Sequence, residues 1–291
     1  DNVASAGLME SSGGVNNFLL ADTTYGSSKG RIYMYDSPSS SVGGGDGEDA
    51  GDYAGSGLAG GPGNDVDGDG LDDVFIGARG DDTGATNAGA VYTWLGGGFG
   101  GGMASADNKL LGGGASASFG RGLSTTGDTN GDGYADVAVG APGIGYVYIF
   151  ENLDPSSASV DTQATDMEAW FYVSSGTFGL NAEGASMSFG DVDGDGTPDA
   201  LLSSAYFDNG ATTDVGATWL IYGPLAGTYT LSSSSAWDAR FIGTSASDYC
   251  GYSSALGDLD ADGRMDILIG CPAGESSAST DFGIVAIFLG R

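Results

Sequence analysis

The chain has 291 residues, with 56 Gly, 39 Asp or Glu, eight Lys or Arg and no His, and its formal net charge is −31. This charge excludes nucleic acid and anionic membranes as partners, because both require a basic protein face. The lack of His removes the commonest general base, and the longest apolar run, residues 284–289, is far too short to insert into a membrane.

The first part of the chain, about residues 1–50, holds two apolar segments that predict strands, 18–22 and 30–35. Ahead of them, the positions that carry acids later in the chain hold other residues, so we predict no metal there. These positions are Met9, Ser11, Gly13, Val15 and Asn17. Residues 37–52 and the glycine-rich run 96–102 are expected to be flexible surface connections.

The second part, about residues 51–112, carries an acidic loop that returns in each later part of the chain. Its sequence at 65–73 is Asp-Val-Asp-Gly-Asp-Gly-Leu-Asp-Asp, and an apolar strand follows at once. Similar loops start at residues 128, 191 and 258, which gives spacings of 63, 63 and 67 residues. The chain is therefore built from repeats, of about 1–50, 51–112, 113–176, 177–245 and 246–291.

The spacing of oxygen-bearing residues within these loops predicts calcium. Positions 1, 3, 5 and 9 carry Asp or Asn, position 7 offers its backbone carbonyl, and Gly at position 6 permits a sharp turn. Calcium takes six to eight oxygens, whereas magnesium demands stricter geometry and zinc favours thiolate or imidazole. We predict four Ca²⁺ sites, with these ligands: Asp65, Asp67, Asp69, Leu71 and Asp73; Asp128, Asn130, Asp132, Tyr134 and Asp136; Asp191, Asp193, Asp195, Thr197 and Asp199; and Asp258, Asp260, Asp262, Arg264 and Asp266.

Two other interpretations of the loops are an EF-hand and a turn without metal. The EF-hand needs a bidentate Glu at position 12, where this chain has Ile76, Val139, Leu202 and Ile269. These apolar residues predict strands, so we expect each loop to join strand to strand. A turn without metal leaves three or four carboxylates to repel one another, and four copies in register argue against it.

The residues around each loop predict a unit of four strands. A segment with small residues precedes the loop (54–58, 119–123, 183–187 and 250–254), and an apolar strand follows it. A third strand (89–94, 145–150, 216–222 and 283–289) and a fourth (109–111, 168–173 and 239–242) complete the unit. Four strands in about 60 residues is the size of a propeller blade. We therefore predict an all-β fold, a β-propeller of four-stranded antiparallel blades with about five visible, in one domain, 1–291.

Three motifs of the third repeat together resemble the FG-GAP repeats of integrin α-subunit propellers and their bacterial relatives. They are Phe119-Gly120, the loop at 128–136 and Gly140-Ala141-Pro142. The resemblance implies a calcium-stabilised β-propeller whose ions lie between the first two strands of each blade. The integrin propeller has seven blades, so either five blades close a ring here or the chain is part of something larger. For ring closure we expect residues 1–6 to add the fourth strand of the last blade, and donation by a neighbouring subunit is the alternative.

The two cysteines occupy matching positions of this motif in the last repeat. Cys250 takes the place of Phe in Phe-Gly, and Cys271 the place of Ala in Gly-Ala-Pro. Since the two strands are expected to be antiparallel neighbours, we predict a Cys250–Cys271 disulfide, with two buried thiols as the alternative. A disulfide indicates an oxidising compartment.

With no signal peptide and Asp1 as first residue, we expect a processed secreted protein or an excised fragment.

No catalytic constellation is recognisable. We predict a secreted, non-enzymatic module for adhesion, cell-surface or extracellular structure, or assembly. Its partner is a protein or glycan ligand on the cell surface or matrix, or further copies of itself in a polymer. The alternatives are a lectin-like carbohydrate-binding propeller and an extracellular polysaccharide lyase or hydrolase. For these, Lys29 and Lys109 sit in no recognisable site, and Trp94, Trp170, Trp219 and Trp237 are expected to be packing residues.

Overall fold

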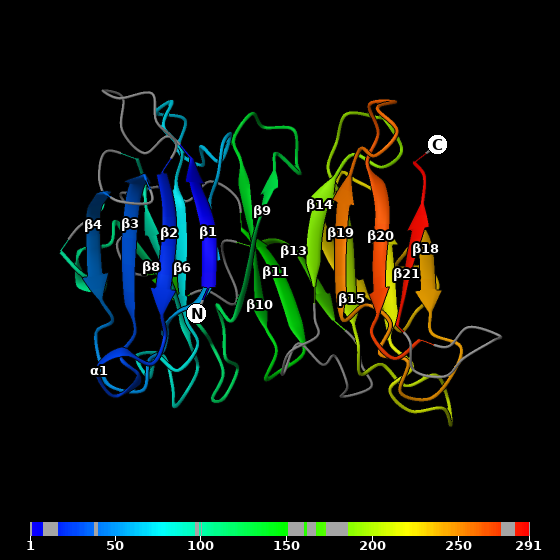
Figure 1. Ribbon diagram of the computed structural model, residues 1–291, viewed down its shortest axis with the longest axis horizontal. Coiled ribbons are helices and arrows are strands. Elements are labelled where there is room, and N and C mark those ends of the chain that lie inside the picture. The colour runs from blue at the N-terminus through cyan, green and yellow to red at the C-terminus, as the bar shows by residue number, and fades with distance from the viewer. Residues whose placement is uncertain are drawn as a thin grey trace. The chain divides into compact units, whose positions relative to one another are not determined.

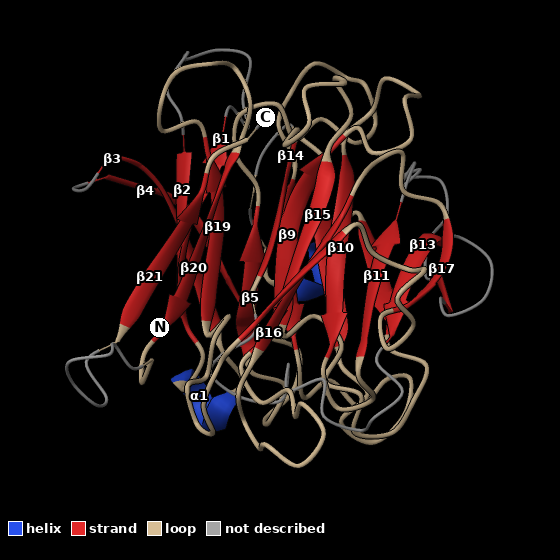
Figure 2. Cartoon of the chain, turned by 90° about the vertical axis from the view of Figure 1, so that its right-hand side faces the viewer, coloured by secondary structure: helices blue, strands red, loops and turns tan. Residues whose placement is uncertain are grey.

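The computed structural model describes residues 2–7, 17–37, 40–96, 99, 101–150, 160–161, 167–172, 186–274 and 283–290. In these ranges the chain is almost entirely strand and loop (Figure 2). The two helical segments described are α1 (Tyr25–Ser28) and the 3₁₀ turn η1 (Met103–Ser105). Neither is long or apolar enough to cross a membrane. The chain divides into two compact units, Asp1–Gly127 with Gly133–Ile144 and Tyr148–Glu168, and Asp128–Asp132 with Gly145–Val147 and Ala169–Arg291.

The first sheet of unit 1 has the order β1 (Asn2–Gly7), β2 (Asn17–Asp22), β3 (Arg31–Ser37) and β4 (Ser40–Asp46), and appears in blue in Figure 1. Strands β2 and β3 confirm the two predicted strands. The prediction for residues 1–6 is wrong, because β1 pairs with β2 as the first strand of this sheet and not with the last blade. Most of the loop expected to lack metal, residues 8–16, lies outside the described residues.

The prediction that residues 37–52 form a flexible connection is also wrong, since β4 pairs with β3 along most of its length. The glycines of β4 allow close approach of other backbone. A Cβ on Gly43 would overlap the carbonyl oxygen of Phe99, and one on Gly45 would lie 2.5 Å from the Cα of Gly102. The glycine run is therefore explained by packing between backbones. Within 96–102, residues 97, 98 and 100 lie outside the described residues.

The second sheet contains β5 (Ala54–Ala59), β6 (Val74–Ala78), β7 (Ala90–Trp94) and β8 (Asn108–Leu111), with the short β12 (Val160–Asp161) parallel to β8. All residues of β6 and β7 are buried. Side chains of the first sheet, such as Leu19 and Met34, share one apolar cluster with Ile76 and Trp94 of the second. The two sheets thus pack face to face through a common core.

The third sheet has the strand order β17 (Gly227–Thr230), β13 (Met167–Tyr172), β11 (Tyr146–Phe150), β10 (Asp136–Ala141) and β9 (Gly122–Gly127). In unit 1, the backbone before β9 approaches the second sheet closely. Phe119 is buried, and a Cβ on Gly77 would overlap the carbonyl oxygen of Gly120. Gly120, the glycine of the Phe-Gly motif, therefore lies against Gly77, the penultimate residue of the second strand in the preceding repeat.

Unit 2 contains a sheet of β14 (Met187–Gly190), β15 (Asp199–Ser204), β16 (Ala217–Ile221) and β18 (Ala239–Ile242). A second sheet contains β19 (Ser253–Gly257), β20 (Asp266–Cys271) and β21 (Ile284–Phe288), three strands within the described residues. Leu201 and Leu220 of the first pack with Ile267 and Ile269 of the second.

The predicted second, third and fourth strands are all found, and the fold class, an all-β propeller-type protein of four-stranded antiparallel blades, is confirmed. The first strands β9, β14 and β19 begin three or four residues later than expected. The residues before two of them take left-handed backbone angles, with φ of 81° at Gly120 and 84° at Gly251, which interrupt regular strand pairing. Residues 183–185 of the third segment lie outside the described residues. That residues 1–291 form one domain stays a prediction.

Candidate metal centres

Each acidic loop joins the first and second strands of a sheet. We call them loop 1 (65–73, between β5 and β6), loop 2 (128–136, between β9 and β10), loop 3 (191–199, between β14 and β15) and loop 4 (258–266, between β19 and β20). The residues at position 12 lie in β6, β10, β15 and β20. The helix that an EF-hand needs after its loop is absent from all four places, so the prediction of strand-to-strand loops is confirmed.

The carboxylate at position 1 folds the loop around itself. In loop 1, Oδ1 of Asp65 accepts the N–H groups of Gly68 at 2.6 Å and Asp69 at 3.1 Å, and Oδ2 accepts that of Gly70 at 2.9 Å. The same three bonds recur in loop 3, where Asp191 accepts from the residues at positions 4, 5 and 6 at 2.6, 3.1 and 2.9 Å. Three local hydrogen bonds therefore hold loops 1 and 3 in their curved shape.

Two residues of each loop take left-handed backbone angles. Position 6 is Gly throughout, with φ of 85° at Gly70 and 94° at Gly196. Position 4 is left-handed as well, with φ of 78° at Gly68 and 62° at Ala261. The sharp turn predicted at position 6 thus has a counterpart at position 4. The recurrence of Gly at position 4 in loops 1 to 3 was the signal that could have found the second turn.

The carboxylates of three loops converge. One oxygen from each of Asp65, Asp67 and Asp73 lies within 4.8 Å of the other two. Loops 3 and 4 contain similar groups, made by Asp191, Asp193 and Asp199 and by Asp258, Asp260 and Asp262. The remaining predicted carboxylates of these loops, Asp69, Asp195 and Asp266, lie outside these groups of three.

Loop 2 carries Asn130 in place of one Asp, and its residues 128–132 and 133–136 fall in different units. Within its first half, Asp128 Oδ1 accepts the N–H of Gly131 at 2.6 Å and that of Asp132 at 3.1 Å. These bonds match those of loops 1 and 3. The first half of loop 2 is thus folded as the other loops are.

The aspartate at position 9 is fully buried in all four loops: Asp73, Asp136, Asp199 and Asp266. In loops 1, 3 and 4 its Oδ2 accepts the N–H of position 2, at 2.7 Å in each case, from Val66, Val192 and Leu259. This bond closes the end of the loop onto its beginning.

Burial of two of these aspartates, Asp73 and Asp199, has an electrostatic cost. Burial, with repulsion from Asp67 and Asp65, raises the pKa of Asp73 to about 7. The pKa of Asp199 is also raised, mainly by burial and partly by Asp193. A bound cation would offset the repulsion between these carboxylates and would favour their ionised form.

The donor set fits a hard cation. Each loop offers carboxylate oxygens, without nitrogen or sulfur ligands, and oxygen is the ligand atom that calcium prefers. The position-7 residues are oriented by their own N–H groups, since Leu71, Thr197 and Arg264 donate to the position-5 Asp at 2.8, 2.7 and 2.9 Å. That the carbonyls of Leu71, Tyr134, Thr197 and Arg264 are ligands stays a prediction.

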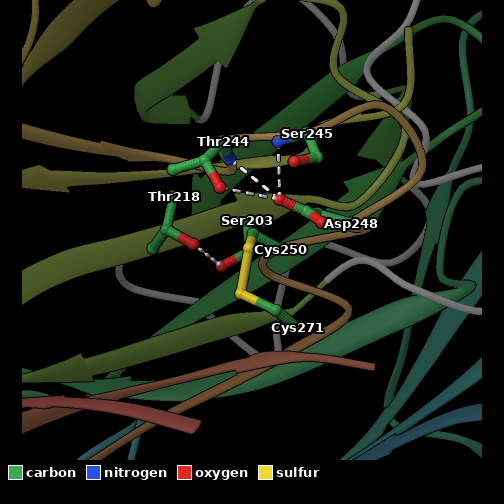
Figure 3. Close-up of a disulfide and its surroundings, with 7 residues drawn as sticks. All are labelled: Ser203, Thr218, Thr244, Ser245, Asp248, Cys250 and Cys271. Atoms are coloured by element: carbon green, nitrogen blue, oxygen red, sulfur yellow. Dashed lines mark hydrogen bonds between the residues drawn. A yellow bond between two sulfur atoms is a disulfide. The ribbon is translucent and has the colours of Figure 1, made fainter. Parts of the chain in front are cut away.

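Cys250 and Cys271, the predicted pair, are joined by a disulfide with Cα atoms 3.9 Å apart (Figure 3). It links the turn before β19 to the end of β20. Beside it, Oδ2 of Asp248 accepts the N–H groups of Thr244 and Ser245 at 2.8 and 2.7 Å. The disulfide and this turn fix the segment that leads into the last sheet.

Lys109, one of the two lysines considered for catalysis, lies in an ion-paired cluster. Its Nζ is 2.6 Å from Glu48 Oε2 and 2.9 Å from Asp81 Oδ2, and Tyr92 donates its hydroxyl to Asp81 at 2.8 Å. Burial opposes ionisation of Asp81, but the hydrogen bonds, led by that from Lys109, outweigh it and hold its pKa below the usual value.

Two of the tryptophans considered for sugar binding are buried in the core. Trp94 and Trp219 are 2% and 0% exposed, in agreement with the predicted packing role.

An all-β chain of repeated antiparallel sheets, with an acidic loop between the first and second strands in four of them, defines a repeat protein of the β-propeller type. The family model of the FG-GAP repeat matches it at residues 56–94, 119–150 and 251–288. FG-GAP repeats thus occur in three places along the chain, in agreement with the resemblance found in its sequence.

Curated relatives share part of this sequence. Integrin alpha-PS2 of Drosophila melanogaster is 44% identical over 115 residues, which is 36% of this chain and 8% of that protein. Human Integrin alpha-7 is 34% identical over 147 residues, 48% of this chain and 11% of that protein. Phosphatidylinositol-glycan-specific phospholipase D of Rattus norvegicus is 32% identical over 176 residues, 55% of this chain and 19% of that protein. The matched region thus spans less than a fifth of each relative.

Proposed function

We propose that loops 1 to 4 each bind one calcium ion and that the chain is a calcium-stabilised module for adhesion, recognition or structure outside the cell. The observation that supports this proposal is the convergence of three carboxylates within 4.8 Å in loops 1, 3 and 4. Each group occupies the same place in its repeat, between the first and second strands. Chance clustering of acids on a surface does not follow such a register.

The ions would stabilise the fold through charge. Calcium supplies two positive charges to each loop, and the loop residues supply the oxygens that hold it. The buried position-9 aspartate would connect the loop to the second strand, so binding free energy would become folding free energy. Four ions add eight positive charges to a chain whose formal charge is −31.

An extracellular location is supported by the disulfide, which forms and persists in oxidising compartments. Two of the three relatives described carry the name integrin, and a protein or glycan ligand on the cell surface or matrix is the partner we propose. Self-assembly is the second partner class. We propose further that residues 1–291 form one propeller domain.

We propose binding over catalysis, although a relative named as a phospholipase D shows that similar repeats also occur in a protein named as an enzyme. In the described part of the chain, Lys109 is held by two carboxylates and is no free base. Trp94 and Trp219 are buried, so neither presents a ring on which a sugar could stack. The lectin and lyase alternatives therefore draw no support from these residues.

Elemental analysis of purified, undialysed protein tests the proposal, followed by calorimetric titration of calcium into protein stripped with a chelator. We expect about four calcium ions per chain and no zinc. A magnesium titration in parallel is the control, and we expect it to saturate at a much higher concentration. Absence of bound calcium in both experiments would contradict the proposal.

A further inference from the structure

A backbone hydrogen bond connects one loop to the loop before it. The N–H of Ala135 in loop 2 donates to the carbonyl oxygen of Asp65 in loop 1, with N···O of 3.0 Å. The N–H of Met265 in loop 4 donates to that of Asp191 in loop 3, at 2.8 Å. In both cases position 8 is the donor, and position 1 of the preceding loop is the acceptor.

A side-chain contact accompanies each of these bonds. The position-7 side chain lies against the position-4 glycine of the preceding loop. A Cβ on Gly68 would overlap the ring of Tyr134, and one on Gly194 would lie 2.7 Å from Nε of Arg264. The preceding loop is thus held at two points, its first residue and its left-handed turn.

One peptide group takes part in both loops. The carbonyl of position 7 and the N–H of position 8 belong to the same planar peptide unit. Under the proposed function, the carbonyl of Arg264 is a ligand in loop 4, while the N–H of Met265 reaches loop 3. A cation that polarises the carbonyl also strengthens the hydrogen bond that the N–H donates.

Loop 3 lacks this connection to loop 2. Its position 8 is Pro198, which has no N–H to donate. The turn of loop 2 is correspondingly uncovered within the described residues, since a Cβ on Gly131 would meet none of their atoms within 4 Å. The direct bond from position 8 is therefore missing at this one step, where loop 2 instead accepts the N–H of Leu225 at the carbonyl oxygen of Thr129, at 3.3 Å.

We propose that the loops act as two coupled pairs, 1 with 2 and 3 with 4, in which residues 7 and 8 of the later loop are positioning residues for the metal site of the earlier one. Occupation of loop 4 raises the calcium affinity of loop 3, and the reverse effect is equal because binding linkage is reciprocal. No such effect connects loops 2 and 3. This inference rests on the proposed calcium binding.

The first experiment removes the donor from loop 4 by Met265→Pro in the full chain. Loop 3 carries Pro198 at the same position, so the loop backbone accommodates proline there. Met265→Ala is the matched control, since it loses the side chain but keeps the N–H. Hydrogen exchange of peptides covering residues 191–199, followed by mass spectrometry across a calcium titration, reads loop 3 directly.

We expect Met265→Pro to raise the half-saturating calcium concentration of loop 3 by about two- to tenfold, the range that one hydrogen bond contributes, while Met265→Ala leaves it near the wild-type value. Equal midpoints in all three proteins, or an equal shift in both variants, would overturn the inference. If wild-type protein gained no protection with calcium, the proposed function itself would fail, so the two failures are distinguishable.

The second experiment tests coupling through metal occupancy. Asp260→Asn with Asp262→Asn removes carboxylates from loop 4, and we expect the calcium midpoint of loop 3 to rise by a similar factor. Asn130→Ala with Asp132→Asn impairs loop 2, and we expect the midpoint of loop 3 to stay constant. A response of loop 3 to the loop 2 variant, or none to the loop 4 variant, would overturn the pairing.

Discussion

Oδ2 of Asp73 accepts the backbone N–H of Val66 at 2.7 Å, so the last acidic residue of loop 1 closes onto the second residue of the same loop. Asp73 is fully buried, while its carboxylate also belongs to the convergent group with Asp65 and Asp67. One side chain thereby serves both the shape of the loop and its charge. The same bond recurs in loops 3 and 4, and in loop 3 the bonded aspartate, Asp199, also belongs to the convergent group.

The substitution Asp73→Asn tests this double role. We expect the protein to bind one calcium ion fewer in a calorimetric titration, because a buried carboxylate ligand becomes a neutral amide. Asp72→Asn is the control, since Asp72 accepts the N–H of Gly63 at 2.7 Å but is not a predicted ligand. We expect Asp72→Asn to keep full stoichiometry. Equal loss in both variants would show that net charge alone governs binding.

Removal of calcium should lower the melting temperature strongly. A site held at 1,000 times its Kd contributes about 4 kcal/mol, so the loss of several sites predicts a fall of about 10 °C or more. Calorimetry or circular dichroism in excess EDTA, and again after calcium is restored, measures the change. An unchanged melting temperature would rule out a structural role for the ion, and EDTA pre-saturated with calcium is the control.

The cluster around Lys109 predicts a stability effect that depends on pH. The folded-state pKa of Asp81 is lowered, so its contribution is present above its unfolded pKa, near 4, and is lost as the pH falls through the folded value. Asp81→Asn leaves Lys109 without one of its carboxylates and should cost about 3 kcal/mol at pH 7. Below pH 4, the difference in the free energy of unfolding between Asp81→Asn and wild-type protein should become smaller.

Urea unfolding at pH 7 and at pH 3 measures this gap. Tyr92→Phe is the matched control, because it removes only the hydroxyl that donates to Asp81 and should cost about 1 kcal/mol. A cost for Asp81→Asn that stayed constant with pH would show that the ion pair is not its source.

The left-handed turn of loop 4 offers a stabilising change. Ala261 has φ of 62° and is exposed, whereas the other loops have Gly at this position. Ala261→Gly should therefore stabilise the protein by about 1 kcal/mol by relieving backbone strain. The reverse change, Gly131→Ala at φ of 82° with open space around it, should destabilise by a similar amount. Thermal melts in saturating calcium measure both effects. We expect the melting temperature to rise for Ala261→Gly and to fall for Gly131→Ala.

Removal of the disulfide should reduce the stability of the protein. Cys250 and Cys271 are 21 residues apart in sequence, and closing a loop of this length contributes about 3 kcal/mol. Replacing both cysteines by serine should reduce the free energy of unfolding by that order. Intact-mass measurement with an alkylating agent, before and after reduction, checks the bond itself, and two reactive thiols before reduction would show that it is absent.

Much of the fold could be predicted because the same sequence features mark the same strand in each repeat. An apolar run after each acidic loop places the second strand, and glycine-led aromatic runs such as residues 145–150 place the third. The fourth strand of the first sheet was missed because Ser40–Asp46 contains three successive glycines and little apolar side chain. Its pairing depends on close backbone contacts with Phe99 and Gly102, which are distant in sequence.

The sequence was enough to predict which residues form each candidate site, but not their burial, their hydrogen bonds or the contacts between loops. Alternating Asp residues place oxygens on one side of a turn, and this indicates a cation. The burial of Asp73 and the hydrogen bond from Val66 depend on how β6 packs, which no local pattern encodes. The contact of Tyr134 with Gly68 likewise joins two loops about 60 residues apart, so only the folded chain reveals it.

The approach of Gly120 to Gly77 carries a lesson for building with this repeat. Two bare backbones meet there, and no side chain of any size fits between them. A designer who transplanted only the acidic loop would carry over the chemistry without the spacer that sets how closely successive units stack. A useful synthetic array would need the first-strand glycine in every module and, opposite it, a residue as small as Gly77 or Ser203, which faces Gly251 in this chain.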